Sequence, residues 1–90
     1  MMRLLKQTKT YLKDSKRTAL SDKHFTKFVQ YLNALSKDEA LPEESKDHAL
    51  MGNWEGYREF HLGGDVLVIY KVTDHEIILT RIGTHSQLFE

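Results

Sequence analysis

Apolar side chains recur at intervals of three and four residues in the segment 22–36, which is the spacing of one face of an α-helix. Ser21 precedes this segment in the position of an N-cap, and Asp22 lies in the first turn. We therefore predict an amphipathic helix over residues 22–36. The residues on its apolar face are Phe25, Phe28, Val29, Leu32 and Leu35.

The pattern is weaker on either side of this helix. Residues 9–20 place a few apolar positions among lysines, which predicts a first helix with a basic outer face, and residues 2–7 fit a short strand. Residues 37–56 show no periodicity and contain Pro42, the only proline. A connection of this length in a small domain is unusual unless it has a function.

Three segments after Gly56 are rich in β-branched, leucine and aromatic residues: YREFHL (57–62), VLVIYKV (66–72) and EIILTRI (76–82). Turn sequences, GGD and TDH, separate them and predict hairpins. The sequence thus predicts one α+β domain over residues 1–90, with two N-terminal helices packed on one face of an antiparallel β-sheet. The predicted core includes Phe28, Val29, Leu32, Val68 and Ile78.

The amino-acid composition of the chain limits the classes of function that it can have. The chain of 90 residues has no cysteine, which excludes disulfides and thiolate metal sites and suits a reducing cytoplasm. The longest apolar run, VLVIY at 66–70, is too short to cross a membrane, and no signal-peptide segment begins the chain. We therefore expect a cytoplasmic protein with no membrane partner.

The charges are segregated although the formal net charge is zero. Residues 1–17 carry six basic residues against Asp14 (six minus one, net +5), whereas residues 38–65 carry two basic against eight acidic residues (two minus eight, net −6). A basic segment of this kind favours nucleic acid or an acidic protein partner, although any single lysine could equally be a solvated surface residue.

Titratable side chains gather in the second half of the chain. Strand alternation puts Glu59 and His61 on one face, and Asp65 follows in the hairpin. The other three candidates are Arg81 near the end of the last strand, His85 just beyond it and His48 in the long connection. No serine or cysteine motif supplies a covalent nucleophile.

Three interpretations of these residues are open. A zinc site would need three or four ligands, but no HExxH-type spacing exists. Each histidine taken alone could simply cap a loop or border the core. Taken together, two histidines can act as general acid and base, and an arginine can neutralise a phosphate in the transition state. Cleavage of RNA by its own 2′-hydroxyl needs those groups and no metal.

Several sequence motifs resemble the YafQ branch of the RelE toxin family from bacterial type II toxin-antitoxin systems. They are DHALMGNWEGYREFHL (47–62), DVLVIYKVTD (65–74) and RIGTHSQLF (81–89), in the family's order. The resemblance implies a RelE-like fold and a ribosome-dependent mRNA interferase that needs no cofactor or metal. It also implies a cognate antitoxin, ribosomes and messenger RNA as partners, and operator DNA bound only through the antitoxin complex.

The resemblance also assigns roles to individual residues. His48, His61, Asp65 and His85 fall on the family's catalytic positions, and Glu59 and Arg81 fall on neighbouring charged positions. Phe89 matches the family's terminal aromatic and is expected to contact the substrate. The other expected substrate-binding residues are Arg58 and Lys71. Two alternatives stay open: a noncatalytic ParE-like binder, and a degenerate toxin that acts only with its antitoxin as a repressor.

Overall fold

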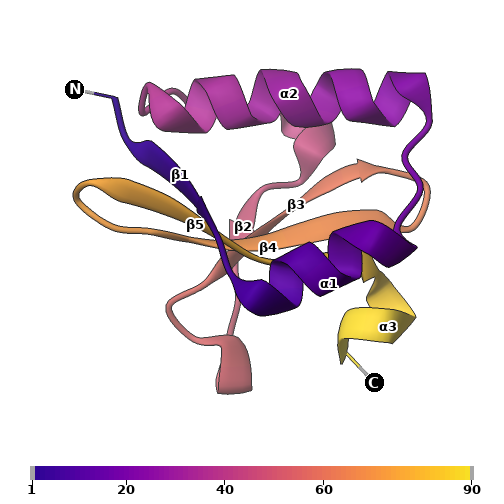
Figure 1. Ribbon diagram of the computed structural model, residues 1–90. Helices are drawn as coiled ribbons and strands as arrows, with labels where there is room; N and C mark the ends of the chain where they lie inside the picture. Colours follow the sequence, from indigo (N-terminus) through magenta and orange to yellow (C-terminus); the bar gives the residue numbers. More distant parts are fainter. Residues whose placement is uncertain (1, 90) are drawn as a thin grey trace.

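The computed structural model describes residues 2–89, which form an α+β fold and confirm the predicted class (Figure 1). Its elements, in chain order, are β1 (Leu4–Gln7), α1 (Lys9–Arg17), α2 (Asp22–Ser36), η1 (Glu43–Ser45), β2 (His48–Ala49), η2 (Gly52–Trp54), β3 (Arg58–Gly63), β4 (Val66–Val72), β5 (Glu76–Thr84) and α3 (His85–Phe89). None of the helices in residues 2–89 has both the length and the apolar character that crossing a bilayer requires.

Side-chain caps fix the start of both N-terminal helices. The Thr8 hydroxyl accepts a hydrogen bond from the Tyr11 amide, and the Ser21 hydroxyl accepts one from the His24 amide. Helix α2 has the predicted bounds. Helix α1 is shorter than the predicted 9–20, because Thr18 adopts an extended conformation (φ −115°, ψ 99°) and ends it.

The five strands within residues 2–89 form one sheet in the order β1-β5-β4-β3-β2. The β2-β3, β3-β4 and β4-β5 pairs are antiparallel, but β1 pairs with β5 in parallel, with Leu4 opposite Glu76. The prediction of a purely antiparallel sheet was therefore wrong. Hairpins are visible in local sequence, whereas the pairing of β1 with β5 joins segments that are distant along the chain.

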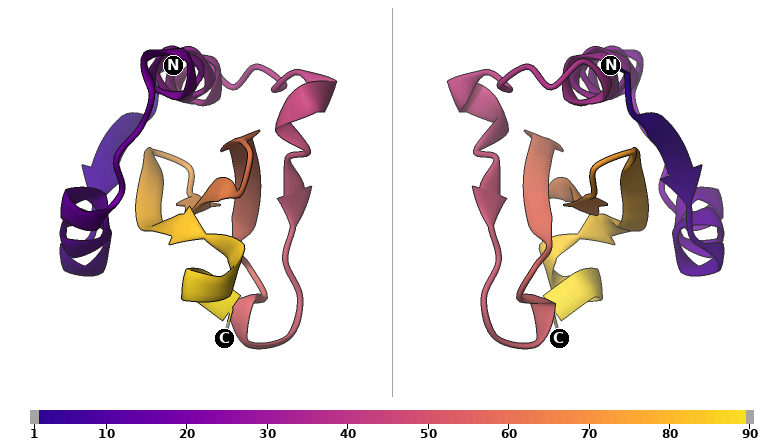
Figure 2. Two further views of the ribbon diagram at one scale, coloured as in Figure 1. Left: turned by 90° about the vertical axis from the view of Figure 1, so that its right-hand side faces the viewer. Right: turned by 90° about the vertical axis from the view of Figure 1, so that its left-hand side faces the viewer.

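One face of the sheet carries the larger hydrophobic core. Tyr11 of α1 and Tyr31 of α2 join the strand residues Phe60, Val68 and Tyr70 in this cluster, and the Tyr31 and Phe60 ring centroids are 5.5 Å apart. Both helices therefore contribute side chains to the same core, with α2 lying across one side of the sheet (Figures 1 and 2).

The five predicted core residues differ in how deeply they are buried. Val68 is fully buried, and Phe28 and Leu32 are partly buried against the cluster. Val29 is 49% exposed, so its assignment to the core was wrong, because α2 is rotated to point Tyr31 inward. Ile78 is only partly buried, and its neighbours on either side, Ile77 and Leu79, fill the core instead.

A second, smaller cluster covers the opposite face of the sheet. Leu67 and Ile69 of β4 pack there against Leu88 of α3. The side chains of Trp54 and Phe89 border this cluster. Helix α3 accordingly lies on the side of the sheet away from α2 (Figures 1 and 2).

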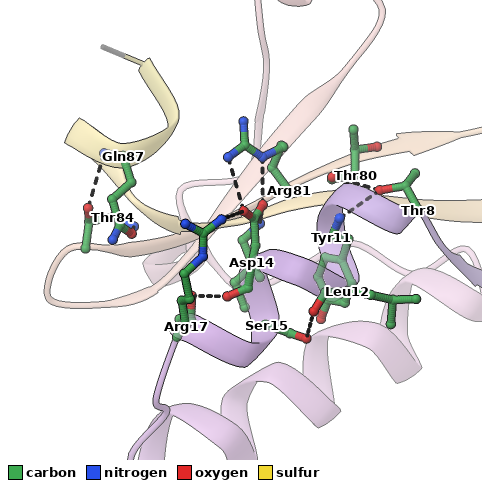
Figure 3. A network of polar contacts seen from close by, with 12 residues as sticks. Thr8, Tyr11, Leu12, Asp14, Ser15, Arg17, Thr80, Arg81, Thr84 and Gln87 are labelled. Carbon is green, nitrogen blue, oxygen red and sulfur yellow. Dashed lines mark hydrogen bonds and ion pairs between the residues drawn. The ribbon is translucent and has the colours of Figure 1, made fainter.

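Helix α1 lies along the edge of β5 beyond the point where β1 ends. The Thr8 hydroxyl donates to the Thr80 carbonyl at 3.0 Å (Figure 3). The Asp14 carboxylate accepts from the Ile82 amide at 3.2 Å. Side chains of α1 thus take the place of a strand for the second half of β5, which satisfies backbone groups that would otherwise face an open sheet edge.

Candidate active site

A buried carboxylate lies between two histidines on the face of the sheet that α3 covers. Oε1 of Glu59 is 3.0 Å from Nε2 of His48 and 3.5 Å from Nε2 of His61. Strand pairing sets this geometry, because β2 places His48 directly opposite Glu59, and alternation along β3 puts His61 on the same face. The segment around His48, expected to be an irregular connection, contributes this short strand.

The ring of His48 is fixed at both nitrogens. Nδ1 lies 2.7 Å from the carbonyl oxygen of Lys46, which can only accept, so Nδ1 carries a proton. Nε2, the other ring nitrogen, lies 3.0 Å from Oε1 of Glu59. The Lys46 carbonyl and the Glu59 carboxylate thus hold the His48 ring between them.

The other oxygen of Glu59 makes this carboxylate unusual. Oε2 is buried and has no hydrogen-bond partner within residues 2–89, and the residue is only 5% exposed. Among the described residues, the two histidines are its ion-pair neighbours, so the burial of Glu59 depends on them.

The segment that carries His48 is anchored by its neighbour Asp47. The Asp47 carboxylate accepts hydrogen bonds from the buried Tyr70 hydroxyl and from Nε of Arg58. Burial, followed by the hydrogen bond to Asp47, raises the pKa of Tyr70 above its ordinary value, so the phenol stays a donor. Arg58, expected to bind substrate, is engaged in this anchor. Sequence reasoning assigned no role to Asp47 or Tyr70.

Helix α3 presents His85 and Phe89 beside the cluster. Their ring centroids are 4.9 Å apart, and the Phe89 ring meets Trp54 edge-on at 6.5 Å. Leu88 of the same helix packs on Leu67, which is the strand partner of His61. His85 is therefore held on the same side of the sheet as His61.

The remaining expected residues lie around this group. Asp65 is exposed in the β3-β4 turn, next to Val66, whose strand partner Thr84 precedes His85. Asp65 makes no ion pair or side-chain hydrogen bond with another described residue. Lys71 is exposed at the far end of β4, where its ammonium lies 5.4 Å from the centroid of the Tyr57 ring.

Arg81 is separated from the histidine cluster. Ile69 stands between Glu59 and Arg81 in the strand register, which places the two backbones roughly 10 Å apart, two strand spacings. Arg81 instead binds Asp14 of α1, with Nε–Oδ2 at 2.6 Å and Nη2–Oδ1 at 3.1 Å. The hydrogen bond to Asp14 raises the pKa of Arg81 further. Sequence reasoning assigned no role to Asp14, although it is the only acid among the basic residues of 1–17.

The geometry provides the groups that acid-base chemistry needs. Among the described residues, no three histidine, cysteine, aspartate or glutamate side chains gather in a form that could hold a metal ion. Nε2 of His48 and Nε2 of His61 both lie near one carboxylate oxygen of Glu59, and a third histidine stands on the same face. Such a set can take a proton from one oxygen and give one to another.

Comparison with known proteins identifies a family. Residues 3–90 match the family model described as the bacterial toxin of type II toxin-antitoxin system, YafQ. The mRNA interferase toxin YafQ of Escherichia coli K12 is 41% identical over 81 residues, which is 88% of this chain and 87% of that protein.

Solved structures of similar proteins share the fold. The YafQ chain of the E. coli DinJ-YafQ complex superimposes with a TM-score of 0.82 at 34% identity, covering 98% of this chain and 99% of that one. A copper-bound mutant toxin from Helicobacter pylori gives a TM-score of 0.82 at 36% identity, covering 99% and 100%.

Proposed function

The chain belongs to the YafQ family of bacterial type II toxins, and from this membership we propose that it is an mRNA interferase that cleaves translated codons on the ribosome. The observation that carries the proposal is the cluster of His48, Glu59 and His61, with His85 on the same face. The RelE-like character of the fold belongs to the same proposal.

The proposed reaction is attack of the 2′-hydroxyl on the adjacent phosphorus. His61 takes the 2′-hydroxyl proton as the 2′-oxygen bonds to phosphorus. His85 protonates the 5′-oxygen as the P–O5′ bond breaks. His48, held beside Glu59, stabilises in its protonated form the charge that develops on the phosphoryl oxygens. The products are a 2′,3′-cyclic phosphate and a free 5′-hydroxyl.

The surrounding residues have supporting roles in this proposal. Phe89 stacks on a base of the message or holds His85 in place, and its contact with the His85 ring supports both uses. Asp65 lies at the end of the sheet where His85 emerges and assists proton transfer there. Arg58 and Lys71 contribute positive charge toward the RNA.

A cognate antitoxin is the second proposed partner. A YafQ structure has been solved with the DinJ antitoxin, and the net +5 segment 1–17 of this chain favours an acidic partner segment. We expect the antitoxin to block entry into the ribosome, and operator DNA to bind only through the complex. The association rate should fall as salt is raised from about 50 to 500 mM, because salt screens the long-range attraction that brings the two proteins together.

The test of activity uses the purified protein with ribosomes translating a defined message. Cleavage should occur within codons, and mass spectrometry should find 2′,3′-cyclic or 3′-phosphate ends and 5′-hydroxyl ends. A chelator selective for transition metals, at constant free Mg²⁺ so that ribosomes stay intact, should leave the rate unchanged. Products with a 5′-phosphate, or a rate abolished by that chelator, would assign the chemistry to a metal-activated water.

Growth assays separate the alternatives. Induced expression should arrest growth and yield transcripts cut in frame. Arrest with uncut transcripts would favour the noncatalytic ParE-like binder. Normal growth combined with antitoxin-dependent binding to operator DNA would favour the degenerate toxin.

A further inference from the structure

A pocket of about 180 Å³ lies between α1, β5 and α3, apart from the histidine cluster. Besides Thr18, its polar lining comes from three elements: α1 provides Asp14 and Arg17, β5 provides Arg81 and α3 provides Gln87. Figure 3 shows the guanidinium groups of Arg17 and Arg81 both turned toward the Asp14 carboxylate. The mechanism above uses none of these four residues.

Asp14 holds Arg81 in a fixed orientation. The carboxylate is nearly buried and accepts three hydrogen bonds: two from Arg81 and one from the Ile82 amide. These contacts engage Nε and Nη2 of Arg81 and leave Nη1 as a further donor. Asp14 is thus committed to its own fold by three hydrogen bonds, while Arg81 keeps hydrogen-bonding capacity.

The orientation of Gln87 adds a second donor. Its Oε1 accepts a hydrogen bond from the Thr84 amide at 2.9 Å, so the side-chain NH₂ is the group left to bind something else. Gly83 permits this position, because a Cβ at residue 83 would lie 2.8 Å from the same Oε1. A side chain there would displace Gln87 from the pocket.

Arg17 supplies the third donor and an unneutralised charge. Its side chain is 74% exposed, and Nη2 is 3.9 Å from Oδ1 of Asp14, a distance at which an exposed pair contributes little. With Asp14 committed to Arg81, the pocket carries one net positive charge. It is lined by donors from three elements, which matches the needs of a phosphate group.

We propose that this pocket binds a backbone phosphate of the RNA that neighbours the cleaved one, with Arg17, Arg81 and Gln87 as donors and Asp14 as the residue that positions Arg81. The inference rests on the proposed RNA substrate. It moves Arg81 away from the scissile phosphate, because Ile69 and Leu88 lie between the pocket and Glu59. The pocket fixes the register of the message and takes no part in bond breaking.

The test compares Arg17→Gln with Lys16→Gln. Both changes remove one positive charge from exposed positions of α1, but Lys16 does not line the pocket. Binding of a 2′-O-methyl RNA hexamer, which cannot be cleaved, is measured by fluorescence anisotropy across a salt series. Arg17→Gln should weaken binding about three- to tenfold. It should also reduce the slope of log K against log salt by about 0.7, the value for one phosphate on a single strand.

Two further readouts decide between this site and a general charge effect. Inorganic phosphate titrated into the whole protein should shift the NMR signals of the Arg81 Nε–H and the Gln87 side-chain amide. In ribosomal cleavage, Arg17→Gln should raise KM and leave kcat unchanged. Equal weakening by both variants, or phosphate shifts elsewhere but not in the pocket, would overturn the inference.

The two proposals fail in different ways. A protein that binds phosphate in the pocket but cleaves no message would refute the proposed function and keep an anion site. A protein that cleaves messages with Arg17→Gln matching Lys16→Gln in KM and in salt slope would keep the enzyme and refute the pocket.

Discussion

The nearly buried carboxylate of Glu59 lies 3.0 Å from Nε2 of His48, whose side chain is 51% exposed. The exposed imidazole of His48 thus contacts a carboxylate that is itself nearly shielded from solvent. Glu59 has no partner for Oε2 within residues 2–89, so the histidine contacts at Oε1 are what offset the burial of this carboxylate.

Glu59→Gln tests this dependence, because the amide keeps the size of the side chain and removes the charge. We expect ribosomal cleavage to fall about 10- to 100-fold, less than the loss of an acid or base itself. NMR of the His48 ring should show a changed environment at Nε2, the nitrogen that faces residue 59. As a control, Glu55→Gln removes a charge from an exposed turn and should leave both readings unchanged. Unaltered cleavage in Glu59→Gln would contradict the assigned role.

His85→Ala removes the proposed acid. The residue is exposed at the start of α3, so thermal unfolding and antitoxin binding should stay close to wild type. Cleavage should fall about 100- to 10,000-fold, the usual worth of a positioned proton donor. Ser86→Ala, at the next exposed position, serves as the control. Single-turnover cleavage on programmed ribosomes measures both, and a reduction below threefold would argue against His85 as the acid.

Phe89→Ala and Phe89→Leu separate packing from ring stacking. Phe89 borders the smaller cluster and touches the rings of Trp54 and His85. Loss of the ring should cost about 1 kcal/mol of unfolding free energy in the alanine variant, and leucine should restore most of it. If stacking on RNA matters, both variants should cleave more slowly, though less severely than His85→Ala. Full activity in Phe89→Leu would reduce Phe89 to a packing role.

Asp14→Ala should be among the more destabilising single changes outside the core. It leaves the Arg81 guanidinium and the Ile82 amide without their acceptor, at an expected cost of about 2–4 kcal/mol. Asp14→Asn keeps an oxygen for the Ile82 amide and should cost less. Urea denaturation followed by circular dichroism measures both. Equal stabilities for the two variants would show that the charge rather than the hydrogen bond to β5 is what matters.

Stability at high pH should depend on Tyr11. Burial raises the pKa of Tyr11 from 10.0 to about 12. The folded state therefore favours the neutral phenol, and this contribution is complete below pH 10 and is lost as the pH rises through 12. The wild type should lose about 1 kcal/mol from this residue between pH 9 and pH 11. Tyr11→Phe should remove that part of the alkaline loss, whereas Tyr57→Phe, at a more exposed ring, serves as a comparison in the same denaturation series.

Local sequence predicted the elements with strong periodicity or strand composition. The helix at 22–36 and the strand at 66–72 have the predicted bounds, because a cap and a run of β-branched residues mark them. The parallel pairing of β1 with β5 was not predicted, because it depends on how α1 and α2 pack on the sheet and on the direction in which β1 then runs. The inward turn of Tyr31 was missed for a related reason: the tilt of α2 on the sheet decides which side of a broad apolar face is buried.

For the site, the sequence predicted residues that alternate along one strand and left contacts between elements open. Glu59 and His61 share a face because they are two apart on β3. The contact of His48 with Glu59 needed the short β2 strand, which has no periodicity to reveal it. The partner of Arg81 was hidden because Asp14 lies 67 positions away and looks like an ordinary helix surface residue.

The pairing of β1 with β5 also bears on when the protein becomes active during its own synthesis. Strand β1 pairs with β5, and both β5 and the helix that carries His85 follow the β3-β4 hairpin in the chain. A nascent polypeptide that ends at this hairpin therefore lacks the strand edge against which α1 packs. Synthesis runs from the N-terminus, and long-range pairing forms late. Under the function proposed above, the site that His85 completes would therefore form only after β5 and α3 have left the ribosome.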